Sequence, residues 1–378
     1  MGTRVDTNLL PELKEYGAVN VEACFNCGNC TAICPLADGD HPFPRNVIRL
    51  IQVGMKDKLI ASADPWLCYY CGECSETCPK GAEPGETLMA VRRWLTAQYD
   101  WTGLGRKFYT SKVWEIGSIL AIAILVTLGF IFFHGPVVTD TVELNTFAPV
   151  EVIHLLDWGM AGILSFFLLS NVFNMFLKIL IKGTDIKIPI TAYIMEAWNI
   201  VYHFLTQKKY SECDNRQPWI NHLILVFGYV TMFAIIVFFL PWFQTDNIYP
   251  ITHPQRWLGY LATIALLYGA GQALWGRVQK IRQMHRFSHL SDWVFPILLI
   301  ITTVTGILVH IFRYVGMPME TYVIYVIHLA VLVPMLILEV PFGKWAHLAY
   351  RPVAQYFVAV RKRAEQTQVA LEAASAAD

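Results

Sequence analysis

The sequence predicts an all-α protein in which a polar N-terminal domain is joined to a bundle of membrane-spanning helices. Hydrophobic residues make up 55% of the 378 residues and charged residues only 15%, which is too apolar for an ordinary soluble protein. Residues 1–112 nevertheless hold 12 Lys or Arg and 13 Asp or Glu, whereas long apolar runs dominate after Val113. We therefore expect a soluble domain over 1–112, a membrane domain over 113–350 and a polar tail over 351–378.

Six apolar runs are long enough to cross a bilayer, which takes about 20 helical residues. They are about 113–133, 150–178, 219–241, 257–275, 292–312 and 321–341. A seventh run, about 188–205, is interrupted by Glu196, Asn199 and His203. We expect this run to be an interfacial helix at the membrane surface.

The positive residues predict the orientation of the bundle. If residues 1–112 are cytoplasmic and six runs span, the inner loops and tail after Val113 hold 15 Lys or Arg, and the outer loops hold only Arg256 and Arg313. The inner ones are Lys178, Lys182, Lys187, Lys208, Lys209, Arg216, Arg277, Lys280, Arg282, Arg286, Lys344, Arg351, Arg361, Lys362 and Arg363. Because positive residues concentrate on the cytoplasmic side, we expect a multi-pass protein of the cytoplasmic (inner) membrane with both termini in the cytoplasm.

Eight of the nine cysteines form two identical arrays. The first array is Cys24, Cys27, Cys30 and Cys34 followed by Pro35, and the second is Cys68, Cys71, Cys74 and Cys78 followed by Pro79. This spacing is typical of bacterial ferredoxins with two 4Fe-4S clusters, in which the fourth cysteine of each run binds the other cluster. We therefore expect Cys24, Cys27, Cys30 and Cys78 to hold one cluster, and Cys68, Cys71, Cys74 and Cys34 to hold the other.

Two other uses of the cysteines are less consistent with the pattern. Disulfides need an oxidising compartment, and no secretory signal is expected from the first residues. Zinc sites usually show two separated pairs of ligands rather than four cysteines in one run. The remaining Cys213 stands alone between apolar stretches, and we expect a buried thiol there.

The segments around the arrays predict a helical cluster domain without the β-strands of a compact ferredoxin. The apolar residues from Val47 to Val53 fit a short amphipathic helix better than an alternating strand. Residues 86–99 also have a helical pattern.

Histidines in the apolar runs indicate haem, which needs two axial ligands from facing helices. His328 and His347 are 19 residues apart. That separation is about 28 Å along a helix and leaves room for two haems b. His222 begins the third span on the inner side, level with His347, and we pair these two on an inner haem.

The partner of His328 on an outer haem is open between His154 and His310. Both lie at the outer end of a span, and His154 follows Pro149 by five residues, which is the better match in depth. His310 follows Gly306, where the lack of a side chain would let a macrocycle approach. The sequence therefore does not decide between His154 and His310. A histidine at a membrane interface also commonly serves only as a hydrogen-bonding group.

Both halves of the chain resemble known families. Residues 24–95 resemble the C subunit of heterodisulfide reductase, in the two arrays and in the segments PFPRNVIRLIQVGMKDKL, PWLCYYCGEC and ETCPKGAEPGE. Residues from about 150 to 350 resemble the haem-b subunits of respiratory nitrate reductase (gamma) and of membrane-bound heterodisulfide reductase (E). That resemblance implies haem ligation by His328, His347 and His222, but Met232 stands where the family has its fourth histidine.

The fusion of the two halves resembles the C subunit of the quinone-interacting membrane-bound oxidoreductase (Qmo) of sulfate reducers. The resemblance implies an electron-transfer subunit of a quinone-linked oxidoreductase complex, in which menaquinol is oxidised at haem b. Apart from the resemblance, the intramembrane Asp157 lies near the expected outer haem, where it could take a proton from quinol or serve as a cap or polar partner. Its partners would be flavin and iron–sulfur subunits of the heterodisulfide reductase A type (Qmo A- and B-like). No motif indicates catalytic residues or nucleic-acid binding. The alternatives are the same conduit in another heterodisulfide reductase or formate dehydrogenase complex, and a haem-free membrane anchor for a ferredoxin domain.

Overall fold

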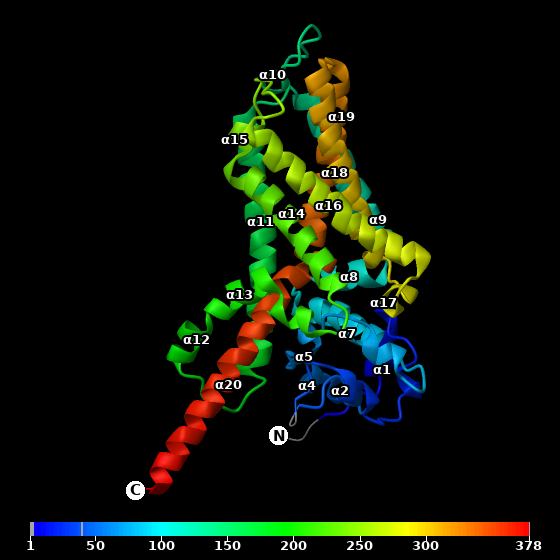
Figure 1. Ribbon diagram of the computed structural model, residues 1–378, viewed down its shortest axis with the longest axis vertical. Coiled ribbons are helices and arrows are strands. Elements are labelled where there is room, and N and C mark those ends of the chain that lie inside the picture. Colours follow the sequence, from blue (N-terminus) through cyan, green and yellow to red (C-terminus); the bar gives the residue numbers. More distant parts are fainter. Residues whose placement is uncertain (1–3, 39–40, 378) are drawn as a thin grey trace.

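The computed structural model describes residues 4–38 and 41–377. Within these residues every regular element is a helix, and the only pairing of extended backbone is an isolated bridge between Asp38 and His41. The all-α prediction is therefore confirmed. Figure 1 shows a compact N-terminal part at one end of a tall bundle, with the C-terminal helix projecting away from both.

The N-terminal part consists of eight short helices in the described residues. They are α1 (Leu9–Glu15), α2 (Asn29–Ile33), α3 (Arg45–Gln52), α4 (Lys56–Ile60), α5 (Asp64–Leu67), α6 (Glu73–Glu76), α7 (Pro84–Tyr99) and α8 (Leu104–Thr110). Helix α7 begins with Pro84, whose fixed φ suits a first helical position. Its Leu88, Trp94 and Leu95 are fully buried, so α7 is the centre of this domain.

Six helices in the described part of the chain are long and apolar enough to cross a membrane, as predicted. They are α9 (Lys112–Phe133), α11 (Val150–Phe176), α14 (Gln217–Phe238), α16 (Pro254–Gln279), α18 (Ser291–Val315) and α19 (Pro318–Pro334). Two of them continue as single π-helical turns, α11 through Leu177–Ile181 and α19 through Met335–Glu339. The second turn begins directly after Pro334, which lacks the N–H that an α-helix would need there.

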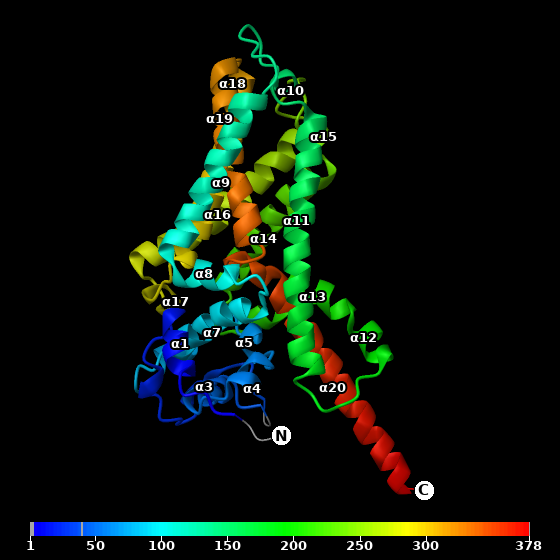
Figure 2. The same ribbon diagram turned by 180° about the vertical axis from the view of Figure 1, so that it is seen from behind.

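Five of the six helices form a row that follows their contacts. Helix α14 packs on α16, α16 on α18, α18 on α19 and α19 on α9. Figure 2 shows α9 and α11 on the back of the bundle. In α9 the single buried residue is Glu115, while Val113, Leu125 and Phe133 are among many exposed apolar side chains. Such an apolar surface is stable in contact with lipid and unfavourable in contact with water.

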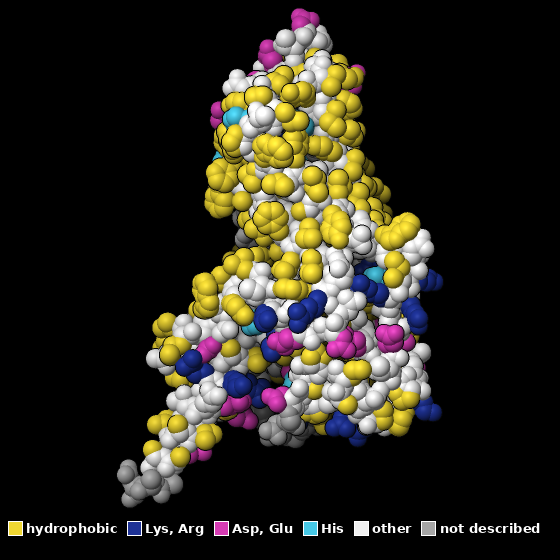
Figure 3. Space-filling model, viewed as in Figure 1, with side chains coloured by type: hydrophobic (Ala, Val, Ile, Leu, Met, Phe, Trp, Pro, Cys, Tyr) yellow, Lys and Arg dark blue, Asp and Glu magenta, His cyan; other side chains and the backbone are white. Residues whose placement is uncertain are grey.

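Hydrophobic and positive side chains divide the surface of the molecule. In Figure 3 the upper part of the visible face is largely hydrophobic, and Lys and Arg gather over the lower half. At the upper end, the bundle is closed by α10 (Leu144–Phe147) and α15 (Leu240–Phe243). The short α17 (Gln283–Arg286) connects α16 to α18 on the side of the N-terminal domain.

Two expected boundaries differ from the structure. The run expected as one interfacial helix over 188–205 forms two helices, α12 (Ile190–Glu196) and α13 (Trp198–Thr206), which meet at Ala197. The tail expected from residue 351 belongs to α20 (His347–Ala377), so the boundary at 350 lies inside a helix. The reason is packing, because Tyr350, Ala354 and Phe357 are buried where α20 crosses α5 and α13.

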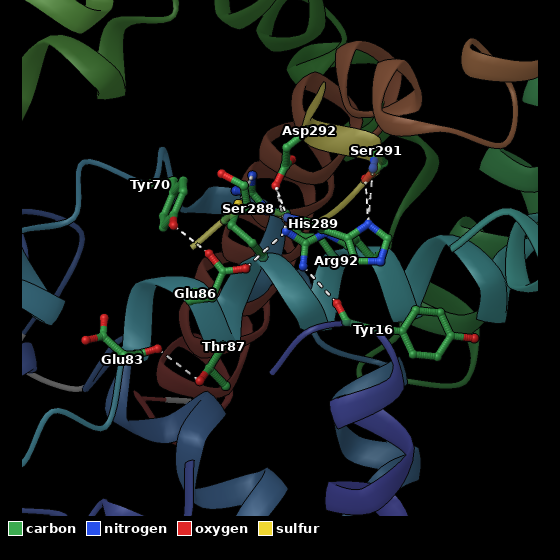
Figure 4. Close-up of polar contacts among 12 residues, drawn as sticks. Tyr16, Tyr70, Glu83, Glu86, Thr87, Arg92, Ser288, His289, Ser291 and Asp292 are labelled. Atoms are coloured by element: carbon green, nitrogen blue, oxygen red, sulfur yellow. Dashed lines mark hydrogen bonds and ion pairs between the residues drawn. The ribbon is translucent and has the colours of Figure 1, made fainter. Parts of the chain in front are cut away.

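A buried ion-pair network joins the N-terminal domain to the bundle. The Arg93 guanidinium donates to Glu86 at 3.1 Å and to Asp292 at 3.2 Å, and Lys344 donates to the same Asp292 carboxylate. Tyr70 donates to Glu86 at 2.5 Å. Figure 4 shows Tyr70, Glu86 and Asp292 converging between α7 and the start of α18. Arg93 therefore links carboxylates from both parts of the molecule.

Replacing Arg93 with methionine is expected to destabilise the folded protein by about 3–5 kcal/mol, because two buried carboxylates lose their shared partner. Thermal unfolding of the purified protein in detergent, followed by release of iron, measures this loss. Arg49→Met is the matched control, since Arg49 is exposed. Equal melting temperatures for the two variants would contradict a structural role for the network.

A second contact between the two parts involves a half-buried histidine. His289 donates from Nε2 to the carbonyl of Tyr109 at 3.0 Å and accepts at Nδ1 from the Ser291 hydroxyl at 3.0 Å. Burial, and then the charge of Arg93, lower the pKa of His289 to about 4. Protonation at Nδ1 in the folded protein would therefore end the acceptance from Ser291 and place a positive charge beside Arg93.

The stability contributed by His289 should be complete above about pH 6.5, the unfolded pKa, and should decline as the pH falls toward about 4. The sign follows because the unfolded chain binds the proton more tightly than the folded one. His289→Gln, which cannot titrate, should show a shallower loss of melting temperature between about pH 6.5 and 4.5. Parallel curves for the variant and the wild type would exclude this role.

Candidate functional site

The structure brings the eight array cysteines together in two sets of four. Cys24, Cys27, Cys30 and Cys78 line one cavity, and Cys34, Cys68, Cys71 and Cys74 line another. These are the two sets that the alternating ligand pattern predicts. The fourth cysteine of each array lies with the first three of the other array.

The repeat extends to the backbone. Gly28 and Gly72 follow the second cysteine of their arrays and have φ values of +91° and +92°. Asn26 and Tyr70 precede the same cysteines and have φ values of 59° and 57°. Left-handed conformations are uncommon outside glycine. Their occurrence at equivalent positions means that each array wraps its cavity by the same local path.

The second array is more deeply enclosed than the first. Cys68 and Cys74 are buried, whereas Cys27 is exposed. Burial raises the pKa of the Cys34 thiol to about 12. Only thiolates bind iron, so a bound metal must supply the positive charge that this apolar environment lacks.

Helix α7 fixes the loop that enters the second array. Arg92 donates to the carbonyl of Pro65 at 2.6 Å, to that of Trp66 at 3.3 Å and to that of Cys68. From the other side, Arg351 of α20 stacks on Tyr69 at 3.4 Å and donates to Trp66. Two separate helices therefore hold the Cys68 loop in place.

His222 and His347 face each other, as expected for a pair of ligands. Their ring centres lie 6.2 Å apart. Two imidazoles that share one metal have centres about 6 Å apart, because each metal–nitrogen bond is about 2 Å long. His222 donates from Nδ1 to Gln207 at 2.7 Å, and His347 donates from Nδ1 to the Lys344 carbonyl at 2.5 Å.

The anchoring of Nδ1 leaves Nε2 available in both rings. No hydrogen bond among the described residues uses Nε2 of His222 or His347. Metal-bound histidines commonly show this arrangement, in which one ring nitrogen donates to a carbonyl or carboxylate and the other binds the metal. Burial lowers the pKa of His347 and keeps the imidazole neutral, which is the form that binds metal. The residues present fit a bis-histidine haem.

His328 has the same anchoring farther along α19. Its Nδ1 lies 3.0 Å from the carbonyl of Thr302 and 3.1 Å from the hydroxyl of Thr305, both on α18. A Cβ placed on Gly306 would lie only 3.1 Å from the ring. The glycine thus lets α18 approach this histidine closely, and Nε2 has no hydrogen bond within the described residues.

The two candidate partners of His328 are engaged elsewhere. His310 accepts at Nδ1 from Arg256 at 2.9 Å and donates from Nε2 to Tyr260 at 2.7 Å, so both ring nitrogens are used. His154 accepts at Nε2 from Trp158 at 3.1 Å. Neither histidine has the free Nε2 of His328, so the structure pairs His328 with no second histidine in the described residues.

A cavity of about 330 Å³ runs through the middle of the bundle. It is lined mainly by apolar side chains, and His154, Asp157, His310 and His328 are among its polar residues. Trp345, two residues before His347, also lines the cavity. Its ring packs on that of Tyr229, with ring centres 4.2 Å apart. The cavity therefore reaches from the outer histidines to the wall of the inner pair. Its size and lining suit a sizeable, mostly apolar ligand.

One connecting segment joins the inner pair to the second cysteine set. It consists of residues 207–213 and includes the 3-10 turn η3 (Lys208–Glu212). Gln207 bonds to His222, and Tyr210 lies 6.3 Å from His222 and stacks on Tyr69 at 4.9 Å, between ring centres. Tyr69 directly follows Cys68. Sequence reasoning did not identify this bridge, because only the fold brings Tyr210 to Tyr69.

Comparison with known proteins identifies the domain that contains the eight array cysteines. Residues 20–82 match the 4Fe-4S dicluster domain family. The chain is 34% identical over 98 residues to a protein of Archaeoglobus profundus that resembles the C subunit of heterodisulfide reductase, covering 26% of this chain and 52% of that protein. It is 34% identical over 82 residues to the iron–sulfur C subunit of the CoB–CoM heterodisulfide reductase of Methanopyrus kandleri, covering 22% and 43% of the two chains.

A third relative is the C subunit of the H2:CoB–CoM heterodisulfide,ferredoxin reductase of Methanothermobacter marburgensis. It is 36% identical over 64 residues, which cover 17% of this chain and 35% of that protein. The chain thus spans about half or less of the length of these curated relatives. No solved structure matches it. The dicluster iron–sulfur prediction is confirmed, and this chain carries a 4Fe-4S dicluster domain joined to a multi-pass helical bundle.

Proposed function

We propose that this chain is the membrane subunit of a respiratory complex and transfers electrons between menaquinol in the membrane and soluble redox subunits. One observation carries the proposal. The His222–His347 pair is connected through Tyr210 and Tyr69 to Cys68, with ring centres 4.9 to 6.3 Å apart at each step. A haem-free anchor would have no need for such a pair beside the second cysteine set.

Bound at these sites, haem b and two 4Fe-4S clusters supply one-electron transfer. The protein's own residues set positions and surroundings. Gln207 and the Lys344 carbonyl orient the rings of His222 and His347, and Thr302 orients His328. We propose His222 and His347 as ligands of an inner haem, and His328 as one ligand of an outer haem.

The outer part of the central cavity is the proposed quinol site. Its wall is apolar and fits an isoprenoid chain, while His154 and Asp157 offer polar atoms to the ring hydroxyls. At the same end, Tyr325 donates to Gln244 at 3.1 Å, and both line the cavity. In this scheme Asp157 takes a proton from quinol, and His310 is a structural residue held by Arg256 and Tyr260.

The two cysteine sets take different positions in the proposed conduit. The second set lies next to Tyr210 and the inner histidines, so it is the proximal one. The first set lies farther out, with Cys27 exposed and with Phe25 exposed beneath Lys80. An exposed aromatic beside a cluster is a suitable contact for a soluble partner. We propose that flavin and iron–sulfur subunits of the heterodisulfide reductase A type dock there.

The names of the relatives favour one second candidate, in which the same conduit serves a membrane-bound heterodisulfide reductase. The two candidates share every residue role and differ only in the soluble partner. In both, the positive lower half of the molecule faces the cytoplasm. Purification from the native membrane and identification of the co-purifying subunits distinguishes them.

The test of the conduit is reduction by a menaquinol analogue under anaerobic conditions. We expect b-type absorption bands to appear first and the electron paramagnetic resonance signals of reduced clusters to follow. Two haems and about eight irons per chain are expected. Purified protein without b-type bands, but with full iron, would contradict the conduit and leave an anchored ferredoxin domain.

A further inference from the structure

Cys213, the one cysteine outside the arrays, lies in the cavity of the proximal cysteine set. It lines that cavity together with Cys34, Cys68, Cys71 and Cys74, and only 6% of its surface is exposed. The sulfur atoms of Cys213 and Cys71 and the carboxylate of Glu73 all lie within 4.8 Å of one another. A thiol from the membrane domain thus reaches the metal site of the N-terminal domain.

The connecting segment 207–213 fixes the position of this thiol. The Cys213 amide donates to the carbonyl of Tyr210 at 3.4 Å, and Tyr210 is itself stacked on Tyr69. At the other end of the segment, Gln207 bonds to His222. Cys213 is therefore placed by the same short turn that connects the inner histidine pair to the proximal set.

The two sulfur atoms have different roles in their contact. Cys71 is one of the four proposed cluster ligands, and a cysteine binds iron as a thiolate, which has no proton to donate. Cys71 is thus the thiolate that accepts, and Cys213 is the thiol that donates. The full set of four ligands is already present without Cys213, so the donor role is the one that remains for it.

We propose that Cys213 is a positioning residue of the proximal cluster, whose S–H group donates to the Cys71 sulfur and raises the reduction potential of that cluster. The inference rests on the proposed function, because it requires a cluster bound by Cys71. Reduction adds negative charge, which a hydrogen bond to a ligand sulfur stabilises. The carboxylate of Glu73 acts in the opposite direction, so the donor also offsets a nearby negative charge.

The test compares Cys213→Ala, Cys213→Ser and the wild type as purified complete chains with their cofactors. Redox titration followed by electron paramagnetic resonance measures the proximal cluster. We expect Cys213→Ala to shift its reduction equilibrium about tenfold toward the oxidised form, or about 59 mV downward. Cys213→Ser keeps a donor and should lie between alanine and the wild type. Ser118→Ala, in α9 and outside the cysteine cavity, is the control and should leave the potential unchanged.

Two results would overturn the proposal. One is an unchanged potential and unchanged signal in Cys213→Ala that retains its full iron. The other is loss of about four irons from Cys213→Ala while Cys71→Ala keeps them, which would make Cys213 a ligand. Failure of the proposed function is a separate result, because it would show as wild-type protein without b-type haem or without iron, whatever the variants do.

Discussion

His347→Ala is expected to remove the inner haem and to stop reduction of both clusters by a menaquinol analogue. The ring of His347 faces His222 at 6.2 Å and has its Nδ1 bound to the Lys344 carbonyl. Loss of a residue that hydrogen-bonds to a metal ligand costs about 10- to 100-fold in metal affinity or activity. Loss of the ligand itself should therefore cost more. Haem per chain and the rate of cluster reduction measure the two effects.

A comparison of two electron donors, the menaquinol analogue and dithionite, makes this prediction specific. Reduction by dithionite reaches the clusters directly and should still work in His347→Ala, so the defect lies between quinol and the proximal set. His134→Ala is the matched control, because His134 is exposed beside the C-terminal end of α9 and its Nδ1 bonds to the neighbouring Gly135 carbonyl. Normal haem content in His347→Ala would disprove the ligand assignment.

The parts of the fold that the sequence predicted are those that depend on local pattern. Six apolar runs became six helices, because each run alone decides whether a segment can cross a membrane. The cysteine spacing predicted two sets of four for a similar reason, since the repeat is contained in short arrays with the same left-handed turns at Gly28 and Gly72. Such features need no knowledge of distant contacts.

The parts that the sequence did not predict depend on contacts between distant segments. Tyr210 and Cys213 have no motif around them, and only the return of segment 207–213 to the N-terminal domain gives them a role. Likewise residues 351–378 were expected to form a polar tail, yet Ala354 and Phe357 of α20 are buried. The sequence also could not predict that both ring nitrogens of His310 are hydrogen-bonded, unlike Nε2 of His328. The partners of His310, Arg256 and Tyr260, come from another helix.

Paired cysteine substitutions are expected to show whether the two arrays exchange their fourth ligands. Cys34 lies in the cavity of Cys68, Cys71 and Cys74, whereas Cys24 lies in the other. The double variant Cys34→Ala with Cys68→Ala should therefore damage one cluster and keep about four irons. Cys34→Ala with Cys24→Ala should damage both and keep almost none. The single variants should each keep about four irons.

The double variants separate the two ligand arrangements because substitutions in one site are not additive, whereas those in independent sites are. If each array bound its own cluster, Cys34 with Cys24 would damage a single cluster and Cys34 with Cys68 would damage both. The iron contents of the two double variants would then be reversed. Both double variants contain Cys34→Ala, so a general loss of folding from that substitution would lower their iron contents equally. Only exchange of ligands between the arrays makes the double variant with Cys24→Ala lose more iron.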